Sequence, residues 1–169
     1  AALGVTETNC GPDPSFTLSG TNVTVSEAGT TATFTAVLDT QPASNVVLSV
    51  TSADTGEATA SPAQLTFTPS NWNTAQPVTV TGIDDNLSDG NQITTVTVSV
   101  VDASSDNAFD PLADQTVAVT TSDDDSPGIS ATESGGSTGT TEAGSTDTFT
   151  VVLNTQPSSD VVVSVASSD

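Results

Sequence analysis

A long internal repeat constrains what this chain can fold into more than any other feature of it. The segment Glu27–Asp54 recurs as Glu142–Asp169, 115 positions later and without a gap, and 19 of the 28 aligned pairs are identical. A repeat of this length has the size of a small domain. We therefore interpret residues 1–13 as the last strand of a preceding repeat with its linker, residues 14–126 as one complete repeat, and residues 127–169 as the first strands of a second, incomplete repeat.

Apolar side chains occupy every second position within the complete repeat, and Thr or Ser stand between them. The pattern is clear in Thr33–Leu38, Val46–Val50 and Val96–Val100. A period of two predicts β-strands with one buried face, and β-branched residues suit such strands. Turn residues separate the runs, as at Gln41-Pro42 and Asp89-Gly90. About seven to eight short strands in one repeat predict an all-β fold, an antiparallel β-sandwich of the immunoglobulin-like class.

The charge of the chain excludes several classes of function. It contains 21 Asp and Glu residues and no Lys, Arg or His, so that its formal net charge is −21. Nucleic-acid binding requires cationic side chains that neutralise phosphates, and direct contact with an anionic membrane requires them too. Catalysis lacks its commonest general base and its amine nucleophile. We therefore predict that the protein is not an enzyme and binds neither nucleic acid nor membrane.

The acidic residues gather where the predicted strands end. They are Glu27, Asp54, Asp84, Asp85, Asp89 and the run Asp123–Asp125. If these strand ends meet at one pole of a sandwich, clustered carboxylates without a counter-ion raise each other's pKa values and oppose folding. Calcium accepts six to eight oxygen ligands, whereas zinc and copper prefer nitrogen and sulfur. The pattern therefore favours bound Ca²⁺, and the alternative interpretation is a set of solvated acidic turns.

Several motifs resemble those of Calx-β domains, which are calcium-binding β-sandwiches that also occur in tandem in large bacterial surface adhesins. The matching segments are Val25–Gly29, Ser49–Asp54, Gly82–Asn86 and Asp123–Gly128. The resemblance implies calcium ligands at Glu27, Asp54, Asp84, Asp85, Asp89, Asp123, Asp124 and Asp125, and extends to Glu142 and Asp169 in the second repeat. The chain departs from the family pattern at Asp89 and Gln92, which implies fewer ions than the family usually holds.

These features predict a non-catalytic structural module of an extracellular stalk or filament on a bacterial cell surface. Calcium at the pole between repeats would neutralise the carboxylates and stiffen the array, so the expected partners are neighbouring repeats or copies of the chain. One alternative is an adhesin module that binds a carbohydrate or a surface protein, although only Trp72 among its residues is of a type that commonly anchors such contacts.

A second alternative is a self-assembling filament or surface-layer subunit that exchanges strands between chains. The repeat offset aligns Gly4–Thr6 with Val119–Thr121, the last strand of the complete repeat, and it aligns Pro127 with Pro12. A strand at the beginning of one chain could therefore pair with the incomplete repeat of another chain by β-strand addition.

Overall fold

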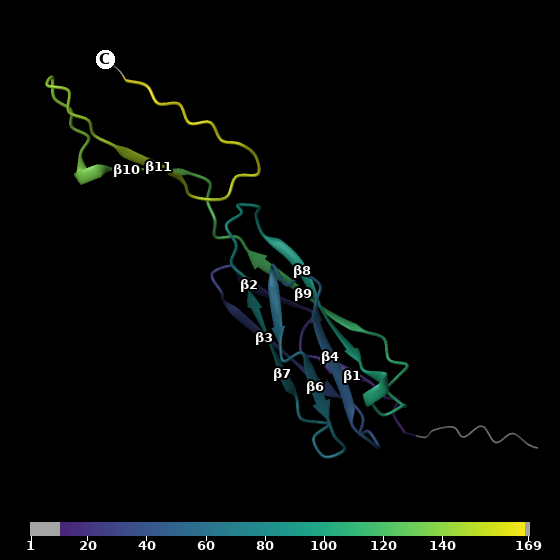
Figure 1. Cartoon of the computed structure of the whole chain (residues 1–169). Helices are drawn as coiled ribbons and strands as arrows, with labels where there is room; N and C mark the ends of the chain where they lie inside the picture. The colour runs from purple at the N-terminus through teal and green to yellow at the C-terminus, as the bar shows by residue number, and fades with distance from the viewer. Residues whose placement is uncertain (1–10, 168–169) are drawn as a thin grey trace, which may run out of the picture.

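The computed structural model describes residues 11–167, and Figure 1 shows their course. One sheet of the complete repeat has the strand order β1-β3-β7-β5, with β1 at Phe16–Leu18, β3 at Thr31–Leu38, β7 at Gln76–Gly82 and β5 at Ala58–Ser61. The other has the order β2-β9-β8-β4-β6, with β2 at Asn22–Ser26, β9 at Gln115–Ser122, β8 at Gln92–Val100, β4 at Val46–Ser52 and β6 at Gln64–Phe67. A short 3₁₀ helix, η1, covers Asp102–Ser104 between β8 and β9.

The predicted all-β sandwich is confirmed, with one difference in strand direction. Strand β2 pairs with β9 in parallel, with Val23 opposite Val119. The other paired strands of the two sheets are antiparallel. The reason is that the edge segment changes sheets: β1 pairs with β3, the chain bends at Ser19–Thr21, and β2 then lies beside β9 in the second sheet.

Alternating side chains of both sheets meet in one core. Its apolar members include Phe34 from β3, Leu48 from β4, Val78 from β7 and Val98 from β8, each at most 1 % exposed. Phe109, in the loop between η1 and β9, is buried with them. The outward positions on the same strands carry Thr and Ser, which is the arrangement that the period of two predicts.

The described part of the second repeat is a β-hairpin followed by extended chain. Strands β10 (Ile129–Glu133) and β11 (Phe149–Leu153) pair antiparallel and form a two-stranded sheet of their own, with η2 (Ser134–Gly136) in the segment between them. Figure 1 shows this hairpin beyond one end of the sandwich. No helix among the described residues is long and apolar enough to cross a membrane.

The pairing register of the hairpin corrects the predicted alignment of the two repeats. At the beginning of the second repeat, the alignment shifts by two residues. Ile129 lies opposite Leu153, as Phe16 lies opposite Leu38 in the complete repeat. Ile129 therefore corresponds to Phe16, and Pro127 corresponds to Pro14 rather than to Pro12. The physical reason is that Leu153 follows Ile129 by 24 positions, whereas Leu38 follows Phe16 by 22. A constant offset therefore fails before β11.

Candidate metal centre

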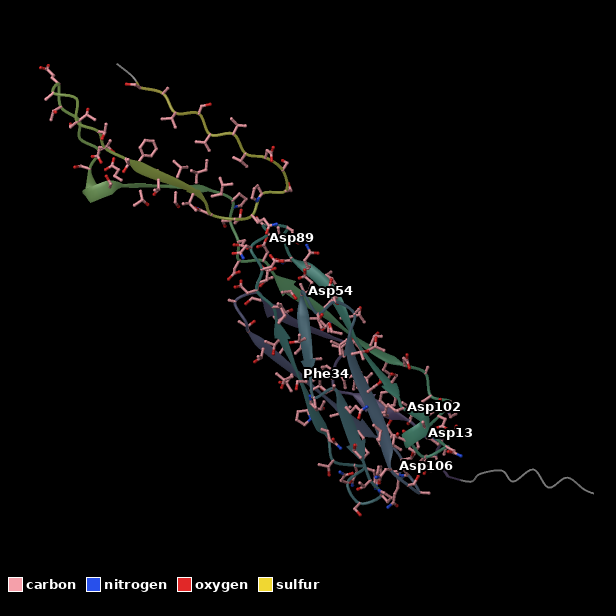
Figure 2. All side chains as sticks on the ribbon, viewed as in Figure 1. Asp13, Phe34, Asp54, Asp89, Asp102 and Asp106 are labelled. Carbon is pink, nitrogen blue, oxygen red and sulfur yellow. The ribbon has the colours of Figure 1, made fainter. Side chains whose placement is uncertain are left out.

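The carboxylates at the strand ends meet at the end of the sandwich from which the chain continues into β10. We call this end the acidic pole; it contains Glu27, Asp54, Glu57, Asp84, Asp85, Asp89, Asp123, Asp124 and Asp125. Figure 2 shows Asp54 and Asp89 at this end, and Asp13 and Asp106 at the opposite end. The loops after β2, β4, β7 and β9 thus supply most of the acidic side chains, as the sequence predicts.

The local fold fixes Glu27 in a buried position at the end of β2. Its backbone N–H donates to the carbonyl oxygen of Ser122 at 3.1 Å, which continues the pairing of β2 with β9. The turn that follows contains Gly29 with φ of 76°, a conformation that glycine adopts without strain. Gly82 at the end of β7 lies so close that a Cβ atom there would overlap the carbonyl oxygen of Ser26. This close approach holds β7 against the strand that presents Glu27.

Hydrogen bonds from the backbone organise the segment after β9. The carboxylate of Asp123 accepts the N–H of Asp125 at 2.8 Å through Oδ1 and the N–H of Gly90 at 2.7 Å through Oδ2. The hydroxyl of Ser88 donates to the carbonyl oxygen of Asp125 at 3.3 Å. The segment Asp123–Asp125 is thereby joined to the loop that follows β7, and its side chains are held near Glu27.

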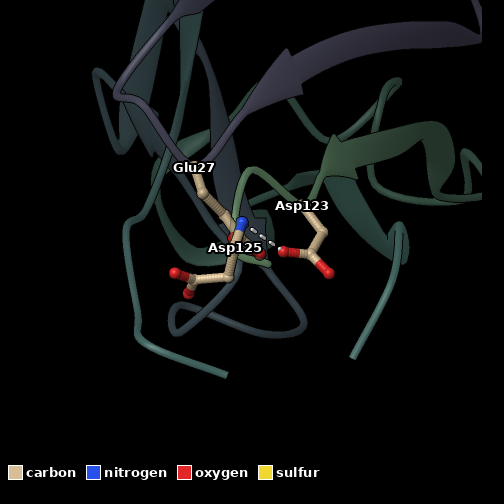
Figure 3. Close-up of side chains that lie close together, drawn as sticks. All are labelled: Glu27, Asp123 and Asp125. Carbon is tan, nitrogen blue, oxygen red and sulfur yellow. Dashed lines mark hydrogen bonds between the residues drawn. The ribbon is translucent and has the colours of Figure 1, made fainter. Parts of the chain in front are cut away.

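Glu27, Asp123 and Asp125 form a compact group of carboxylates. One oxygen atom from each lies within 4.8 Å of one oxygen atom of each of the other two, and Figure 3 shows the three side chains. Glu27 is only 1 % exposed, and its Oε2 has no hydrogen-bond partner among the described residues. The Oδ2 atom of Asp125 is also buried without such a partner. A buried polar atom normally has a partner, so this group is incomplete as the protein alone forms it.

The electrostatics of the group disfavour its charged form. Burial raises the pKa of Glu27 above its ordinary value, and the negative charges of Asp123 and Asp85 raise it further; a hydrogen bond from the backbone of Asp124 has a smaller, opposite effect. Loss of solvation also raises the pKa of Asp125, with contributions from Asp123, Asp124, Asp84 and Asp85. A bound cation would reverse these effects because it favours the ionised carboxylates.

Glu57 is a member of the acidic pole that the sequence analysis missed. It precedes β5, and burial raises its pKa, followed by the charges of Asp89, Asp54 and Asp85. Its carbonyl oxygen accepts the N–H of Ile83 at 2.9 Å, which ties its turn to the end of β7. Glu57 stands alone in a turn rather than in an acidic run, so no local pattern marked it; its position three residues after Asp54 was the one available signal.

The remaining predicted ligands have different positions. Asp85 accepts the N–H of Leu87 at 2.7 Å, and Asp54 accepts the N–H of Gly56 at 2.9 Å, so both stabilise turns at the acidic pole. Asp84, Asp89 and Asp124 are exposed there. Glu142 is exposed in the segment between β10 and β11, outside the compact group. Asp169, the last predicted ligand, and residues 1–10 lie outside the described residues.

The donor set fits calcium better than other common ions. The compact group offers carboxylate oxygens alone, and each carboxylate can bind through one or both oxygens. Asp123 retains lone pairs beyond its two hydrogen bonds. Zinc and copper sites use imidazole and thiolate, which this group lacks. The negative charge of Asp85 also acts on the pKa of both Glu27 and Asp125, which adds to the local demand for a cation.

Comparisons with known proteins give only distant structural likenesses. No family model and no curated protein match the chain. It is similar to the structure of SSP-19, an MSP-domain-like protein of Caenorhabditis elegans, with 18 % identity over 63 % of this chain and 99 % of that chain and a TM-score of 0.46. It is also similar to the Escherichia coli chaperone DraB, with 10 % identity over 68 % of this chain and 58 % of that chain and a TM-score of 0.49. At these scores the likeness carries no functional argument, and the relationship to Calx-β domains stays a prediction.

Proposed function

We propose that the protein is a non-catalytic, calcium-stabilised structural module of an extracellular stalk or filament. The observation that carries this proposal is the group of Glu27, Asp123 and Asp125, in which a buried glutamate oxygen has no partner among the described residues. A chain without Lys, Arg or His cannot neutralise such a group with its own side chains. A divalent cation from solution supplies the missing charge and the missing contacts.

The position of the group explains how an ion would stiffen the protein. Glu27 belongs to the end of β2, whereas Asp123 and Asp125 belong to the segment that leaves β9 toward the second repeat. An ion held by all three would fix the exit segment to the body of the sandwich. The loop at Ser88 and Gly90 would be fixed with it, because both residues hydrogen-bond to the exit segment. Successive repeats would then hold one orientation instead of pivoting about the linker.

The proposed location outside a cell suits the affinity that such a site needs. Calcium sites of extracellular modules have dissociation constants of about 10⁻⁴–10⁻³ M. A free calcium concentration ten to a hundred times higher than the dissociation constant stabilises the folded state by about 1.4–2.7 kcal/mol, provided that the unfolded chain does not bind calcium.

Thermal unfolding in calcium and in chelator tests the proposal. The melting temperature should be several degrees higher in about 10 mM CaCl₂ than in excess EDTA, because calcium binds the folded state alone. Magnesium at the same concentration serves as the control for ionic strength and should give a smaller shift. Equal melting temperatures in calcium, magnesium and EDTA would contradict the proposal.

Self-assembly through strand addition is a second candidate, and the exposed hairpin favours it. Ile129, Phe149 and Val151 are 54 %, 44 % and 37 % exposed, although they lie at positions that are buried in the complete repeat. A strand from another chain could cover this face. Sedimentation velocity over a hundredfold range of concentration tests this candidate: growing oligomers would support it, and a constant monomer would contradict it.

A further inference from the structure

A pocket lies at the end of the sandwich opposite the acidic pole. It has a volume of about 500 Å³, and Pro14, Thr40, Gln41, Trp72 and Phe109 are among the residues that line it. We call it the Trp72 pocket. Trp72 is the one Trp of the chain; it is half-buried and packs against the core, so its ring forms part of the pocket wall. The proposed calcium site does not involve this pocket.

In the second repeat, the turn that corresponds to Thr40-Gln41-Pro42 of this pocket contacts the complete repeat. The turn Thr155-Gln156-Pro157 of that repeat lies against the acidic pole of the complete repeat. There the backbone N–H of Gln156 donates to the carbonyl oxygen of Asn86 at 2.7 Å. Leu87, Ser88 and Asp89 line one cavity together with this turn and with Pro127. The chain thus contains one contact between the loop Asn86–Asp89 and the beginning of a following repeat.

The Trp72 pocket is built from the same turn in the complete repeat. Thr40-Gln41-Pro42 is identical in sequence to Thr155-Gln156-Pro157, and Pro14 corresponds to Pro127 in the register of the strands. The backbone before the turn also agrees. The N–H of Asp39 donates to the carbonyl oxygen of Ser15 at 2.9 Å, and the equivalent bond joins Asn154 to Gly128 at 2.9 Å.

The hydrogen-bonding groups of the Trp72 pocket are unequally satisfied. The Oγ1 atom of Thr40, a residue of the Trp72 pocket, is buried and has no hydrogen-bond partner among the described residues. Buried hydroxyls normally have a partner. Because this oxygen is shielded from solvent, an incoming loop could bond to it only after the Thr40 side chain rotates to another rotamer. The two acidic residues of the pocket already have partners. Asp39 accepts the hydroxyls of Ser15 and Thr17, and Asp106 accepts backbone N–H groups.

We propose that the Trp72 pocket is the docking site for the loop Asn86–Asp89 of another copy of the complete repeat, placed before it in series. This inference deepens the proposed stalk function and rests on it, because it requires repeats that follow one another. The contact would repeat the one between Asn86 and Gln156, with the N–H of Gln41 as the donor. It would join the acidic pole of one repeat to the Trp72 pocket of the next one, next to the metal site but with separate residues.

Charge sets the expected salt dependence of this contact. The incoming loop brings Asp89 toward a pocket that contains Asp39 and Asp106, so the partners repel each other at long range. Added monovalent salt screens that repulsion, with a Debye length of about 8 Å near 0.15 M. Docking should therefore become stronger as salt concentration rises, which is the opposite of an ordinary ion-paired interface.

A duplicated chain with a cysteine pair tests the proposal. A second copy of residues 14–126 is inserted between Ser126 and Pro127, and Cys10→Ser removes the native thiol. Asn86→Cys in the first copy and Gln41→Cys in the second copy then place thiols at the proposed contact. Residues whose backbones are hydrogen-bonded across a contact are near enough for a disulfide. We expect efficient disulfide formation under mild oxidation, read from mobility in non-reducing electrophoresis and from the intact mass.

Two matched pairs calibrate this measurement. In the chain without duplication, Asn86→Cys with Gln156→Cys should form a disulfide, because that contact is present. In the duplicated chain, Asn86→Cys of the first copy and Asp102→Cys of the second copy should not form a disulfide. Asp102 is exposed at the same end of the sandwich as the Trp72 pocket, but it lies outside the pocket. Failure of the Gln41 pair while the Gln156 pair forms would overturn the proposal.

Fluorescence provides a readout without cysteines. With Trp72→Phe in the first copy, the remaining Trp72 reports on the pocket of the second copy. Its quenching by acrylamide should fall by about twofold relative to the chain without duplication, because a docked loop excludes solvent. Unchanged quenching would overturn the proposal. Both experiments are run in calcium and in EDTA: docking in either condition supports the pocket assignment, whereas the calcium shift of the melting temperature separately decides the metal proposal.

Discussion

The segment Glu27–Asp54 and its counterpart Glu142–Asp169 share 19 of 28 residues, but the described part of the counterpart is far more exposed. Phe34 is 1 % exposed in β3, and its equivalent Phe149 is 44 % exposed in β11; Leu48 is 0 % exposed in β4, and its equivalent Val163 is 43 % exposed. Both regions form a strand at the Phe position, where β3 pairs with β1 and β7 and β11 pairs with β10. Burial comes from the distant strands β7, β8 and β9, for which the described hairpin has no equivalents.

A second contrast shows how far the local signal extends. Residues 46–52 form β4, whereas the equivalent residues 161–167 form no strand, although both runs contain alternating Val. Strand β11 keeps its partner because β10 is nearby in sequence. Strand β4 instead pairs with β6 and β8. In these two segments, alternation of apolar and polar residues therefore yields a strand only where a partner strand is present to pair with it.

Substitution of the paired phenylalanines should give the largest difference between the regions. Phe34→Ala removes a fully buried ring and should lower the free energy of unfolding by about 3–5 kcal/mol. Phe149→Ala should change it by less than about 0.5 kcal/mol, because its ring is already exposed. Urea unfolding followed by circular dichroism measures both. Equal losses would mean that the hairpin is part of the same cooperative core.

Two glycines provide a smaller contrast. Gly82→Ala places a methyl group against the backbone of Ser26 and should cost about 1–3 kcal/mol. Gly139→Ala, in the segment between β10 and β11, meets no atom within 4 Å and should be nearly neutral. Because Gly82 supports the strand end that presents Glu27, its substitution should also weaken the calcium response. A neutral Gly82→Ala would contradict the close approach of β7 to β2.

The equivalent glutamates Glu27 and Glu142 allow a matched test of the metal site. Glu27→Gln should raise or preserve stability in EDTA, since it removes a buried charge, and should abolish most of the stabilisation of about 1.4–2.7 kcal/mol by calcium. Glu142→Gln should leave the calcium response intact because Glu142 is exposed outside the group. Melting curves in calcium and EDTA give the comparison. An unchanged calcium response in Glu27→Gln would remove Glu27 from the site.

The smallest expected effect is the dependence of stability on pH in EDTA. The raised pKa of Glu27 means that the folded state binds more protons than the unfolded chain between the ordinary value of 4.5 and the raised pKa. Stability should therefore increase as the pH falls from neutral toward 4.5. Asp106, whose pKa is lowered by hydrogen bonds from the backbone N–H groups of Ala108 and Ser44, has the opposite effect only near and below 3.8.

Calcium should reverse the dependence of stability on pH. In calcium, stability should decrease as the pH falls, because protons compete with the ion for the same carboxylates. Urea titrations at intervals between pH 7 and pH 4.5, with EDTA or with calcium, measure both slopes. A metal-free protein that loses stability steadily on acidification over this range would contradict the arrangement of Glu27, Glu57 and Asp125, whose pKa values are all raised.

The sequence predicted most of the fold because its signals are local. Alternation of Val and Thr marked the strands, whereas the repeat boundary near Ser126 stays a prediction. The parallel pairing of β2 with β9 had no such signal, since it depends on a change of sheet at Ser19–Thr21. The two-residue difference in alignment before β11 was also hidden, because only strand register reveals it.

The candidate site was predictable where acidic residues follow strands directly. Asp123 and Asp125 belong to an acidic run, and Glu27 follows the first alternating segment, so sequence spacing placed all three at strand ends. Their unequal environments were not predictable: Glu27 is buried, whereas Asp124 is exposed. The close packing of β7 at Gly82 against Ser26, the residue before Glu27, joins strands far apart in the sequence, and no spacing within the sequence encodes it.

Crystallographic determination of the calcium-bound protein tests the central claim most directly. We predict a strong peak of electron density, with anomalous signal, at about 2.3–2.6 Å from carboxylate oxygens of Glu27, Asp123 and Asp125. Crystals grown in excess EDTA should lack that peak. Ordered water alone beside these three side chains, in crystals equilibrated with 10 mM calcium, would contradict calcium binding at this site.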